Sequence, residues 1–407
     1  MRNILIIGAG DFQLPIVQRA SLNYNVLLAA PAIPKEFEPY IGDSFIVDVR
    51  NKVKILDYAR KKQICGVITD QTDIAVRSVA YVAEYMGLPG IGYETGCLFT
   101  DKDLMRQKLK KMGVPVLPYQ TVSSKAEALD YYRKIGGDVI IKPLDMQGSR
   151  GVQICRSYTE LDTKYAEAAR WSSDKKVIVE RYATGKEFVV EGMALNYEFR
   201  NLCIGDTQYF NLPDAFAAKS RIFPTIINDV LRDRVLDLNS RIIREFGLKQ
   251  GITHSEFIMD GDEIYLIETA ARGGGVFISS DLIHLSCGLD TEKFLLDIAT
   301  GIQKDFPKIE PQQCVCGYLA FYIPTGKVVS VNGVEEIKSL PYIYRNQLDK
   351  IKVGMINTDG HTDKTSRLAL ILSAPNRNVF DERAKVVKEI LKVETITENG
   401  IEPLIWD

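Results

Sequence analysis

Two glutamates stand in apolar stretches where a strand has no structural need for a charge. Glu268 ends the run 264–267, and Glu256 lies upstream in the run 252–259. The sequence at 260–262 predicts a tight turn, so the two runs form a hairpin in which the glutamates are neighbours. Adjacent carboxylates repel each other unless a cation lies between them, and Mg²⁺ is held by one or two carboxylates together with substrate phosphates. The hairpin therefore predicts a Mg²⁺ site, with an exposed hairpin carrying solvated acids as the alternative.

An arginine and three glycines follow the second glutamate. Arg272 indicates contact with anionic oxygens. The glycines at 273–275, together with Ser279 and Ser280, have backbone N–H groups and hydroxyls that suit a substrate carboxylate. A turn that leads into a helix capped at Ser279 or Ser280 explains the same residues equally well.

A second set of residues has the chemistry of a phosphate site. Lys142 lies in the apolar run 139–143, and the glycine-containing loop 147–152 follows it. Backbone N–H groups of such a loop approach an anion closely, and lysines supply the positive charge. Lys102, at the start of an earlier helical pattern, provides a second cation. The pattern predicts a site for nucleotide phosphates.

Residues suited to a nucleoside follow further along. The apolar run 177–179 leads into Glu180, Arg181 and Tyr182, and Glu187 comes soon after. Adenine needs apolar walls and backbone edges, whereas ribose hydroxyls need a carboxylate acceptor. This segment offers both.

Three basic residues allow two interpretations each. His254 lies two positions before Glu256, so both side chains share one face of a strand; a structural, hydrogen-bonded histidine is favoured over a substrate-binding one. Lys219 and Arg221 either face a reacting phosphate or are ordinary charges of a surface loop.

The length, charge and cysteine content of the chain indicate which class of protein it is. The chain has 407 residues, which predicts two or three domains. Fifty-one Lys and Arg against fifty-three Asp and Glu give a net charge of −2, so no global attraction for nucleic acid or an anionic membrane is expected. Seven cysteines without a CxxC pair predict reduced thiols rather than a zinc site. The N-terminus lacks a signal peptide and no run is long enough to cross a membrane, so a cytoplasmic location is expected.

The first hundred residues alternate short strands with helices, which predicts βαβ units around a parallel sheet. The glycine pattern after the first strand has Gln13 where a dinucleotide fold needs its third glycine, and no acid follows the second strand. Both features argue against a nicotinamide enzyme. The expected strands are 4–7, 25–29 and 66–69, and the expected helices are 14–21, 52–61 and 74–85.

A charged amphipathic helix at 101–112 begins a second part of the chain. The expected helices that follow are 121–136, 158–171, 229–246 and 381–391, with a short tail after the last. The expected strands are 139–143, 176–181, 189–194, 199–204, 251–259, 315–323 and 327–331.

Placed in order, these segments resemble the ATP-grasp superfamily and, within it, the carboxylate–amine ligases, with an ATP-grasp fold like that of biotin carboxylase and the large subunit of carbamoyl-phosphate synthase. The segments that carry the resemblance are Asp101-Lys102 with Arg106, 140–143 with 148–152, 179–182 with 185–188, and Glu256 with Glu268, flanked by 69–75, 87–90, 333–337 and 366–368. The match spans nearly the whole chain.

The resemblance implies a protein of mixed α/β and α+β class in three parts. A parallel-sheet pre-ATP-grasp domain would occupy residues 1–100, and a two-lobed ATP-grasp body, with a lid at about 120–180, would occupy 101–305. A small α+β domain would follow at 306–407. ATP would lie between the two lobes.

The resemblance also implies roles for single residues. Lys102 and Lys142 would hold phosphates, Glu256 and Glu268 would carry Mg²⁺, with Mn²⁺ as an alternative ion, and Arg272 would steady the acyl phosphate. Lys142 and Arg272 are the expected catalytic residues. Glu180 and Tyr182 would contact adenine, and Glu187 the ribose. The other expected nucleotide contacts are Arg181 and the loop residues Gly148, Ser149, Arg150 and Gly151.

One position departs from the family pattern. Many members carry Asn two residues after the second metal-binding glutamate, and this chain has Ala270. The change removes one oxygen ligand, which water or phosphate must replace. The strength of a second metal site is therefore in question.

The implied reaction joins a small-molecule carboxylate, activated by ATP as an acyl phosphate, to an amine, and releases ADP and phosphate. Amino acids are the leading substrate class. Purine-pathway or carbamoyl-phosphate-synthase-like chemistry on bicarbonate or formate is the enzymatic alternative, and an ATP-binding regulator without turnover is the alternative of another class. The resemblance leaves a homodimer open.

Overall fold

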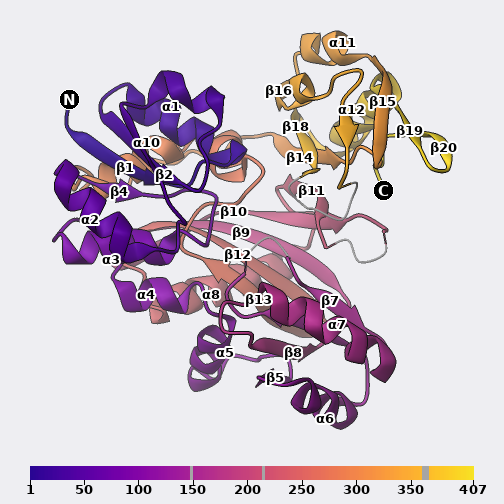
Figure 1. Ribbon diagram of the computed structural model, residues 1–407, viewed down its shortest axis with the longest axis horizontal. Coiled ribbons are helices and arrows are strands. Elements are labelled where there is room, and N and C mark those ends of the chain that lie inside the picture. Colours follow the sequence, from indigo (N-terminus) through magenta and orange to yellow (C-terminus); the bar gives the residue numbers. More distant parts are fainter. Residues whose placement is uncertain (147–149, 213–215, 360–365) are drawn as a thin grey trace. The chain divides into compact units, whose positions relative to one another are not determined.

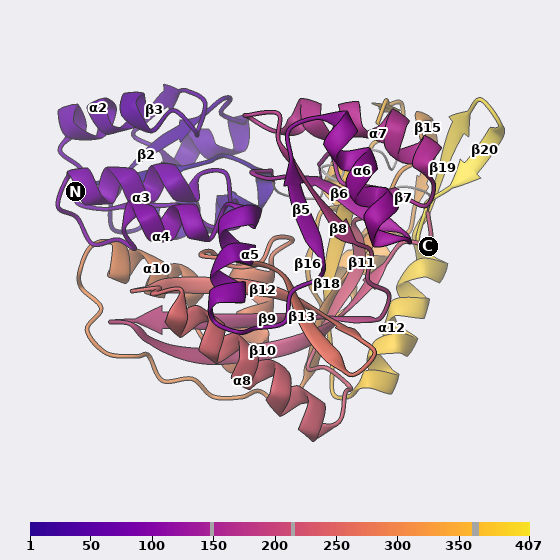
Figure 2. The ribbon, with the colours of Figure 1, turned by 90° about the horizontal axis from the view of Figure 1, so that it is seen from below.

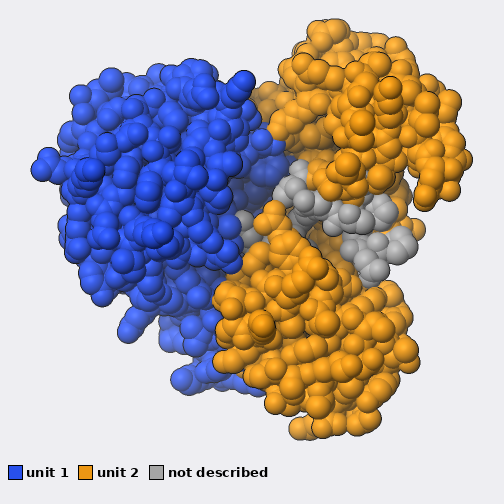
Figure 3. All heavy atoms as spheres, in the orientation of Figure 1, with its two compact units in different colours: residues 1–117, 189–204, 227–311 blue, residues 118–188, 205–226, 312–407 orange. Residues whose placement is uncertain are grey.

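The computed structural model describes residues 1–146, 150–212, 216–359 and 366–407. The chain forms two compact units, each assembled from three separate segments (Figure 3). The first unit comprises residues 1–117, 189–204 and 227–311, and the second comprises 118–188, 205–226 and 312–407.

The first unit begins with the predicted parallel sheet, whose strand order is β3-β2-β1-β4. Its strands are β1 (Asn3–Ile7), β2 (Asn25–Ala30), β3 (Asp43–Ile46) and β4 (Val67–Ile68). Both faces are buried, because successive side chains of β1 alternate between them and residues 4–7 are all fully buried. The mixed α/β class with an N-terminal parallel sheet is confirmed.

Helices cover this sheet (Figure 1). Leu5 and Ile7 pack with Ile55 and Leu56 of α2 and with Val82 of α3 on one face. The helices around the sheet are α1 (Leu14–Ser21), α2 (Lys52–Lys62), α3 (Val76–Tyr85) and α10 (Thr291–Ala299). The short helices of this part are η1 (Asp11–Gln13), η2 (Lys35–Tyr40) and α4 (Tyr93–Leu98).

The rest of the first unit is built on strands in the order β13-β12-β9-β10. These are β9 (Lys186–Leu195), β10 (Glu198–Tyr209), β12 (Gly251–Asp260) and β13 (Glu263–Ala270); the first residues of β9 and the last residues of β10 belong to the second unit. The predicted hairpin is confirmed: Glu256 pairs with Glu268, a β-bulge follows Glu256, and Gly261 makes the turn with a φ of 62°. The accompanying helices are α5 (Lys102–Lys111), α8 (Asp229–Glu245), the π-helical turn η3 (Ile278–Leu282) and α9 (Ile283–Cys287).

One sheet of the second unit has the order β5-β8-β6-β7, with α6 and α7 beside it (Figure 2). Its strands are β5 (Tyr119–Val122), β6 (Val139–Pro143), β7 (Gln153–Cys155) and β8 (Val177–Arg181), and the helices are α6 (Lys125–Ile135) and α7 (Tyr158–Trp171). The predicted helix 121–136 is wrong at its start. Thr121 and Val122 pair with β8, as suits β-branched residues, and the Ser124 side chain caps α6 by accepting from the N–H of Glu127.

The remainder of the second unit contains strands in the order β10-β11-β14-β18-β16 and a small sheet in the order β17-β15-β19-β20. The strands are β11 (Ala218–Phe223), β14 (Val315–Phe321), β15 (Gly326–Asn332), β16 (Ile343–Asn346), β17 (Ile356–Asn357), β18 (Leu368–Ala374), β19 (Lys392–Thr397) and β20 (Gly400–Pro403). The helices are α11 (Val334–Ser339), η4 (Leu348–Lys350) and α12 (Arg377–Ile390).

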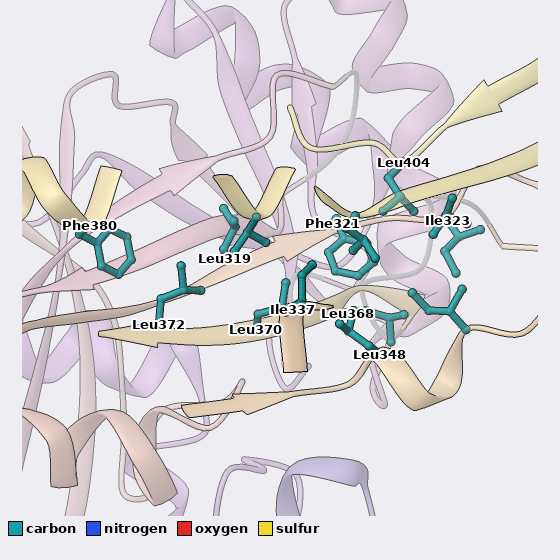
Figure 4. Packing of buried hydrophobic residues seen from close by; sticks show 14 of the residues in the cluster. Leu319, Phe321, Ile323, Ile337, Leu348, Leu368, Leu370, Leu372, Phe380 and Leu404 are labelled. Atoms are coloured by element: carbon teal, nitrogen blue, oxygen red, sulfur yellow. The ribbon is translucent and has the colours of Figure 1, made fainter. Parts of the chain in front are cut away.

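The core of this part lies on one face of its larger sheet (Figure 4). Alternate residues of β18, such as Leu370 and Leu372, pack with Leu319 of β14 and Phe380 of α12. The predicted tail after residue 391 is instead the hairpin β19–β20, in which Val393 and Thr395 are buried and their neighbours are exposed. That period of two is a strand signal.

Within the described residues, no helix is long and apolar enough to span a bilayer. All seven cysteines are free thiols.

Candidate active site

The predicted site residues fall into two groups, one in each unit. The first unit contains Lys102, Glu256, Glu268 and Arg272; the second contains Lys142, Arg150, Gly151, Glu180, Arg181, Tyr182 and Glu187. Gly148 and Ser149 lie outside the described residues.

In the first unit, the hairpin register brings Glu256 and Glu268 opposite each other. Lys102 is the first residue of α5, a helix that Asp101 caps by accepting from the N–H groups of Asp103 at 3.0 Å and Leu104 at 3.1 Å. The buried Lys102 ammonium donates to Glu268 Oε1 at 3.2 Å. Lys102, which was predicted to bind phosphates, thus also contacts a predicted metal ligand.

The glutamate pair suits a magnesium ion that is shared with substrate phosphates. Both carboxylates are partly accessible, with side-chain exposures of 25% for Glu256 and 31% for Glu268. In the described part of the chain, no group of three or more His, Cys, Asp or Glu side chains is arranged to hold a metal. Two carboxylates without a protein cage are typical of Mg²⁺ that is bound through phosphates, so the donor set fits that ion.

His254 links Glu256 to a buried acid. The imidazole Nε2 lies 3.3 Å from Glu256 Oε1, which confirms that the two side chains share a strand face. Nδ1 makes a short hydrogen bond with Glu191, a fully buried residue of β9. The second oxygen of Glu191 accepts from the N–H of Gly274 at 3.2 Å. These contacts support the structural interpretation of His254.

Arg272 is held by Asp73, a residue of the loop after β4. Its Nε and Nη2 donate to the two carboxylate oxygens at 2.8 and 2.7 Å, and its Nη1 donates to the Gly273 carbonyl at 2.8 Å. Burial would lower the pKa of Arg272, but the carboxylates of Asp73, Glu268 and Glu191 raise it above its ordinary value. The guanidinium therefore stays charged and is fixed in orientation.

The same loop also holds the segment that follows the three glycines. Asp70 accepts from the Ser279 hydroxyl at 2.9 Å, and Gln71 accepts from the N–H of Phe277 at 3.1 Å. Val276 and Phe277 are left-handed, with φ of 58° and 59°. The prediction of a helix cap at Ser279 or Ser280 is wrong, because both lie inside η3 and the Ser279 hydroxyl binds Asp70.

In the second unit, Lys142 and Glu180 form a buried ion pair. Val139 and Ile141 of β6 point into the core below this sheet, so Lys142 points to the opposite face. Glu180 of β8 shares that face, and its Oε2 accepts from the Lys142 ammonium at 2.9 Å. The side chains are 10% and 0% exposed. The lysine predicted to bind phosphate and the acid predicted near adenine thus contact each other.

The described part of the predicted phosphate loop contains Gly151, a position at which the backbone conformation and the close neighbours favour glycine. Gly151 has a φ of 72°, and a Cβ there would lie 2.7 Å from the Trp171 side chain and 2.9 Å from Pro143. No other residue fits this close approach without displacing its neighbours. Arg150 precedes it and is partly exposed.

The predicted adenine and ribose residues continue from β8. The N–H of Arg181 donates to the Pro118 carbonyl and that of Tyr182 to the Asp138 carbonyl, both at 2.9 Å. Glu187 accepts from the Tyr209 hydroxyl. Burial and the nearby Glu187 carboxylate raise the pKa of Tyr182, which keeps its phenol protonated.

Lys219 and Arg221 lie on strand β11, so the interpretation as residues of a surface loop is wrong. Lys219 forms an ion pair with Asp407, and Arg221 is buried.

Two residues of the first group, Glu191 and Asp73, are not among those predicted from the sequence. Glu191 carries the same signal that identified Glu268, an acid inside an apolar strand, and could have been found by it. Asp73 has no such signal, because its partner Arg272 is 199 residues away in the chain.

The chain is similar to known proteins over most of its length. Residues 135–281 match the sequence model of the ATP-grasp domain family. The chain is 27% identical over 407 residues to the uncharacterized protein y4rH of Sinorhizobium fredii, a match that covers 98% of this chain and 80% of that protein. It is 25% identical over 277 residues to the alanine–anticapsin ligase of Bacillus subtilis, which covers 61% of this chain and 57% of that protein.

Its fold is that of the L-amino acid ligase from Bacillus licheniformis. The TM-score is 0.83 at 20% identity, with 97% of this chain and 98% of that chain covered. The sequence match thus marks residues 135–281 as an ATP-grasp domain, and the structural similarity shows that the chain shares the fold of that ligase.

Proposed function

We propose that this protein activates a carboxylate with ATP and joins it to an amine, releasing ADP and phosphate. The observation that carries the proposal is the pairing of Glu256 with Glu268 in the β12–β13 hairpin, where Lys102 contacts Glu268 and Arg272 follows the same strand. Phosphoryl transfer is catalysed mainly by positioning and charge neutralisation, and these residues would supply both.

The proposed reaction has two steps. A carboxylate oxygen of the substrate attacks the γ-phosphorus of ATP, the bond from that phosphorus to the bridging oxygen breaks, and ADP leaves. The amine nitrogen then attacks the acyl carbon, the carbon–oxygen bond to phosphate breaks, and the nitrogen loses a proton to phosphate or water. The products are an amide, ADP and inorganic phosphate.

We assign the protein groups as follows. Glu256 and Glu268 would hold Mg²⁺, or Mn²⁺ in its place, which when bound neutralises phosphate charge. Lys102 and Lys142 would bind phosphate oxygens, and each would have to exchange its carboxylate contact for the nucleotide. Arg272, already oriented by Asp73, would face the negative charge of the acyl phosphate. Glu187 and Tyr182 would contact the nucleoside.

Amino acids are the proposed substrate class. Two similar proteins, the alanine–anticapsin ligase and the L-amino acid ligase, carry amino-acid substrates in their names, which supports the assignment.

The test is release of ADP and phosphate by the purified chain with Mg·ATP over pairs of amino acids and small carboxylates, with bicarbonate in a separate arm. Release that requires both a carboxylate and an amine is the expected result. Stimulation by bicarbonate would move the assignment to carboxylation or carbamoyl transfer. ATP binding without ADP release over the whole panel would favour a non-catalytic regulator.

A further inference from the structure

Glu191 is a buried acid for which the proposed reaction has no use. It lies within the apolar strand β9, and its side chain is 0% exposed. A carboxylate in such a place is costly unless hydrogen bonds compensate it. Both of its oxygens are engaged, one by His254 Nδ1 and the other by the N–H of Gly274.

The contact with His254 connects Glu191 to the glutamate pair. The imidazole, only 4% exposed, lies between Glu191 and Glu256, with Nε2 3.3 Å from Glu256 Oε1. In the hairpin register His254 is opposite Ala270, whose small side chain is compatible with the imidazole on that face. One nitrogen bound to Glu191 fixes the plane of the ring and therefore the position of the other.

The contact with Gly274 connects Glu191 to the arginine turn. A Cβ at position 274 would lie 2.8 Å from His254 Nδ1, so turn and imidazole pack directly against each other. Arg272 lies two residues earlier on this turn, and the Glu191 charge contributes to the raised pKa of its guanidinium. One buried carboxylate thus contacts two segments that carry proposed catalytic groups.

We propose that Glu191 is a positioning residue: through His254 it orients Glu256, and through Gly274 it fixes the turn that carries Arg272. This inference rests on the proposed function, in which Glu256 binds the cation and Arg272 faces the acyl phosphate. Outer-shell partners of this kind change metal affinity or activity by about 10–100-fold when removed.

The experiment measures cation affinity independently of turnover. Binding of Mn²⁺ to the full-length chain with saturating ADP is titrated by electron paramagnetic resonance for the wild type, E191A, E191Q and H254A. The Mg²⁺ dependence of ADP release is recorded alongside. We expect affinity for Mn²⁺ to fall by about 10–100-fold in E191A and H254A. E191Q keeps an acceptor for the Gly274 N–H and should lose less.

A matched control comes from the other face of the same strands. The Ser255 and Thr269 hydroxyls form a buried hydrogen bond of 2.7 Å between β12 and β13. S255A should lower the unfolding temperature and leave Mn²⁺ affinity unchanged. If E191A does not fold, E191Q and H254A provide the same comparison.

The outcomes separate this inference from the proposed function. If the wild type releases ADP, and E191A and H254A bind Mn²⁺ as tightly as S255A does, the positioning role is overturned and the proposed function is not. Wild type that neither binds Mn²⁺ with ADP nor releases ADP would overturn the proposed function and this inference with it. Weakened Mn²⁺ binding in E191A and H254A, but not in S255A, supports the role.

Discussion

Arg272 and Asp73 show what a single pair contributes to the first unit. Two hydrogen bonds join them, and each side chain is 13% exposed. D73N keeps the volume but removes the negative charge, so the buried arginine loses its compensation. We expect the free energy of unfolding to fall by about 3–5 kcal/mol. Urea unfolding measures the change.

The control for D73N is a solvent-exposed ion pair of the same protein. Asp48 and Arg50 are joined at 2.8 Å, but their side chains are 50% and 54% exposed. D48N should therefore change stability by about 0–1 kcal/mol. Equal effects of D73N and D48N would show that the Asp73 pair has no special energetic role.

Glu268 is the residue on which the cation assignment depends. E268Q removes one charge of the pair while keeping its size. We expect it to abolish ADP release and to spare most of the affinity for ATP, because the lysines and the nucleoside contacts are unchanged. Glu263, exposed at the start of β13, is the matched control, and E263Q should be fully active. An active E268Q enzyme would refute the cation assignment.

Asp70 makes stability depend on pH. Burial raises its pKa to about 6, although the Ser279 hydroxyl and the Arg272 charge oppose the shift. The folded chain holds this proton more tightly than the unfolded chain does. The stability that it contributes is therefore complete below about pH 4 and is lost as pH rises through about 6.

D70N carries no charge at any pH, so its unfolding free energy should vary less than that of the wild type between about pH 4 and 6. At pH 8, D70N should be more stable by up to about 3 kcal/mol, which corresponds to the shift of about two pKa units. Burial also raises the pKa of Glu292, to about 8, so pH dependence above 6 should persist. D57N, at an exposed position of α2, serves as control. Parallel pH profiles of D70N and wild type would contradict the prediction.

At the level of elements, the turn after β13 is constrained at one glycine and open at the next. A Cβ at Gly274 would lie 2.8 Å from His254 Nδ1 and from the Ile278 side chain, whereas at Gly275 it meets nothing within 4 Å. G274A should destabilise the chain by about 1–3 kcal/mol through overpacking. G275A should be nearly neutral or slightly stabilising.

Thermal unfolding of the two alanine variants checks this prediction, and ADP release shows whether the turn also matters for the reaction. The added Cβ would shift the turn and with it the backbone N–H that donates to Glu191, so G274A should reduce turnover as well. Equal melting temperatures for G274A and G275A would mean that the turn adapts without cost.

For the whole molecule, nucleotide binding should appear as stabilisation. A ligand that binds only the folded chain adds about 2.7 kcal/mol at 100 times its dissociation constant. We therefore expect Mg·ADP to raise the unfolding temperature in proportion to the logarithm of its concentration. Mg²⁺ without nucleotide, at matched ionic strength, is the control. A melting temperature that does not respond to Mg·ADP would argue against nucleotide binding.

The sequence by itself determined features that depend on local pattern. Short apolar strands that alternate with helices predicted β1, β2 and β4 of the parallel sheet but not β3, and the turn signal at 260–262 predicted the β12–β13 hairpin. The β-bulge after Glu256, which places Glu256 opposite Glu268, was not predicted. Pairing across a tight turn is short-range, so period and turn chemistry suffice to predict it. The start of α6 and the β19–β20 hairpin were missed, because local signals of helix, strand and tail compete at such boundaries.

Only the tertiary structure decided which distant side chains meet. Three contacts join residues that are far apart in the chain. The separation is 199 residues for Asp73 and Arg272, 63 for Glu191 and His254, and 38 for Lys142 and Glu180. Their contacts follow from strand order and from loops that meet in space, which a single sequence does not encode locally. Most of the charged groups of the candidate site could therefore be predicted from the sequence, whereas the partners that orient them depend on tertiary packing. The physical reason is that a buried charge must be compensated by the group that the fold places beside it.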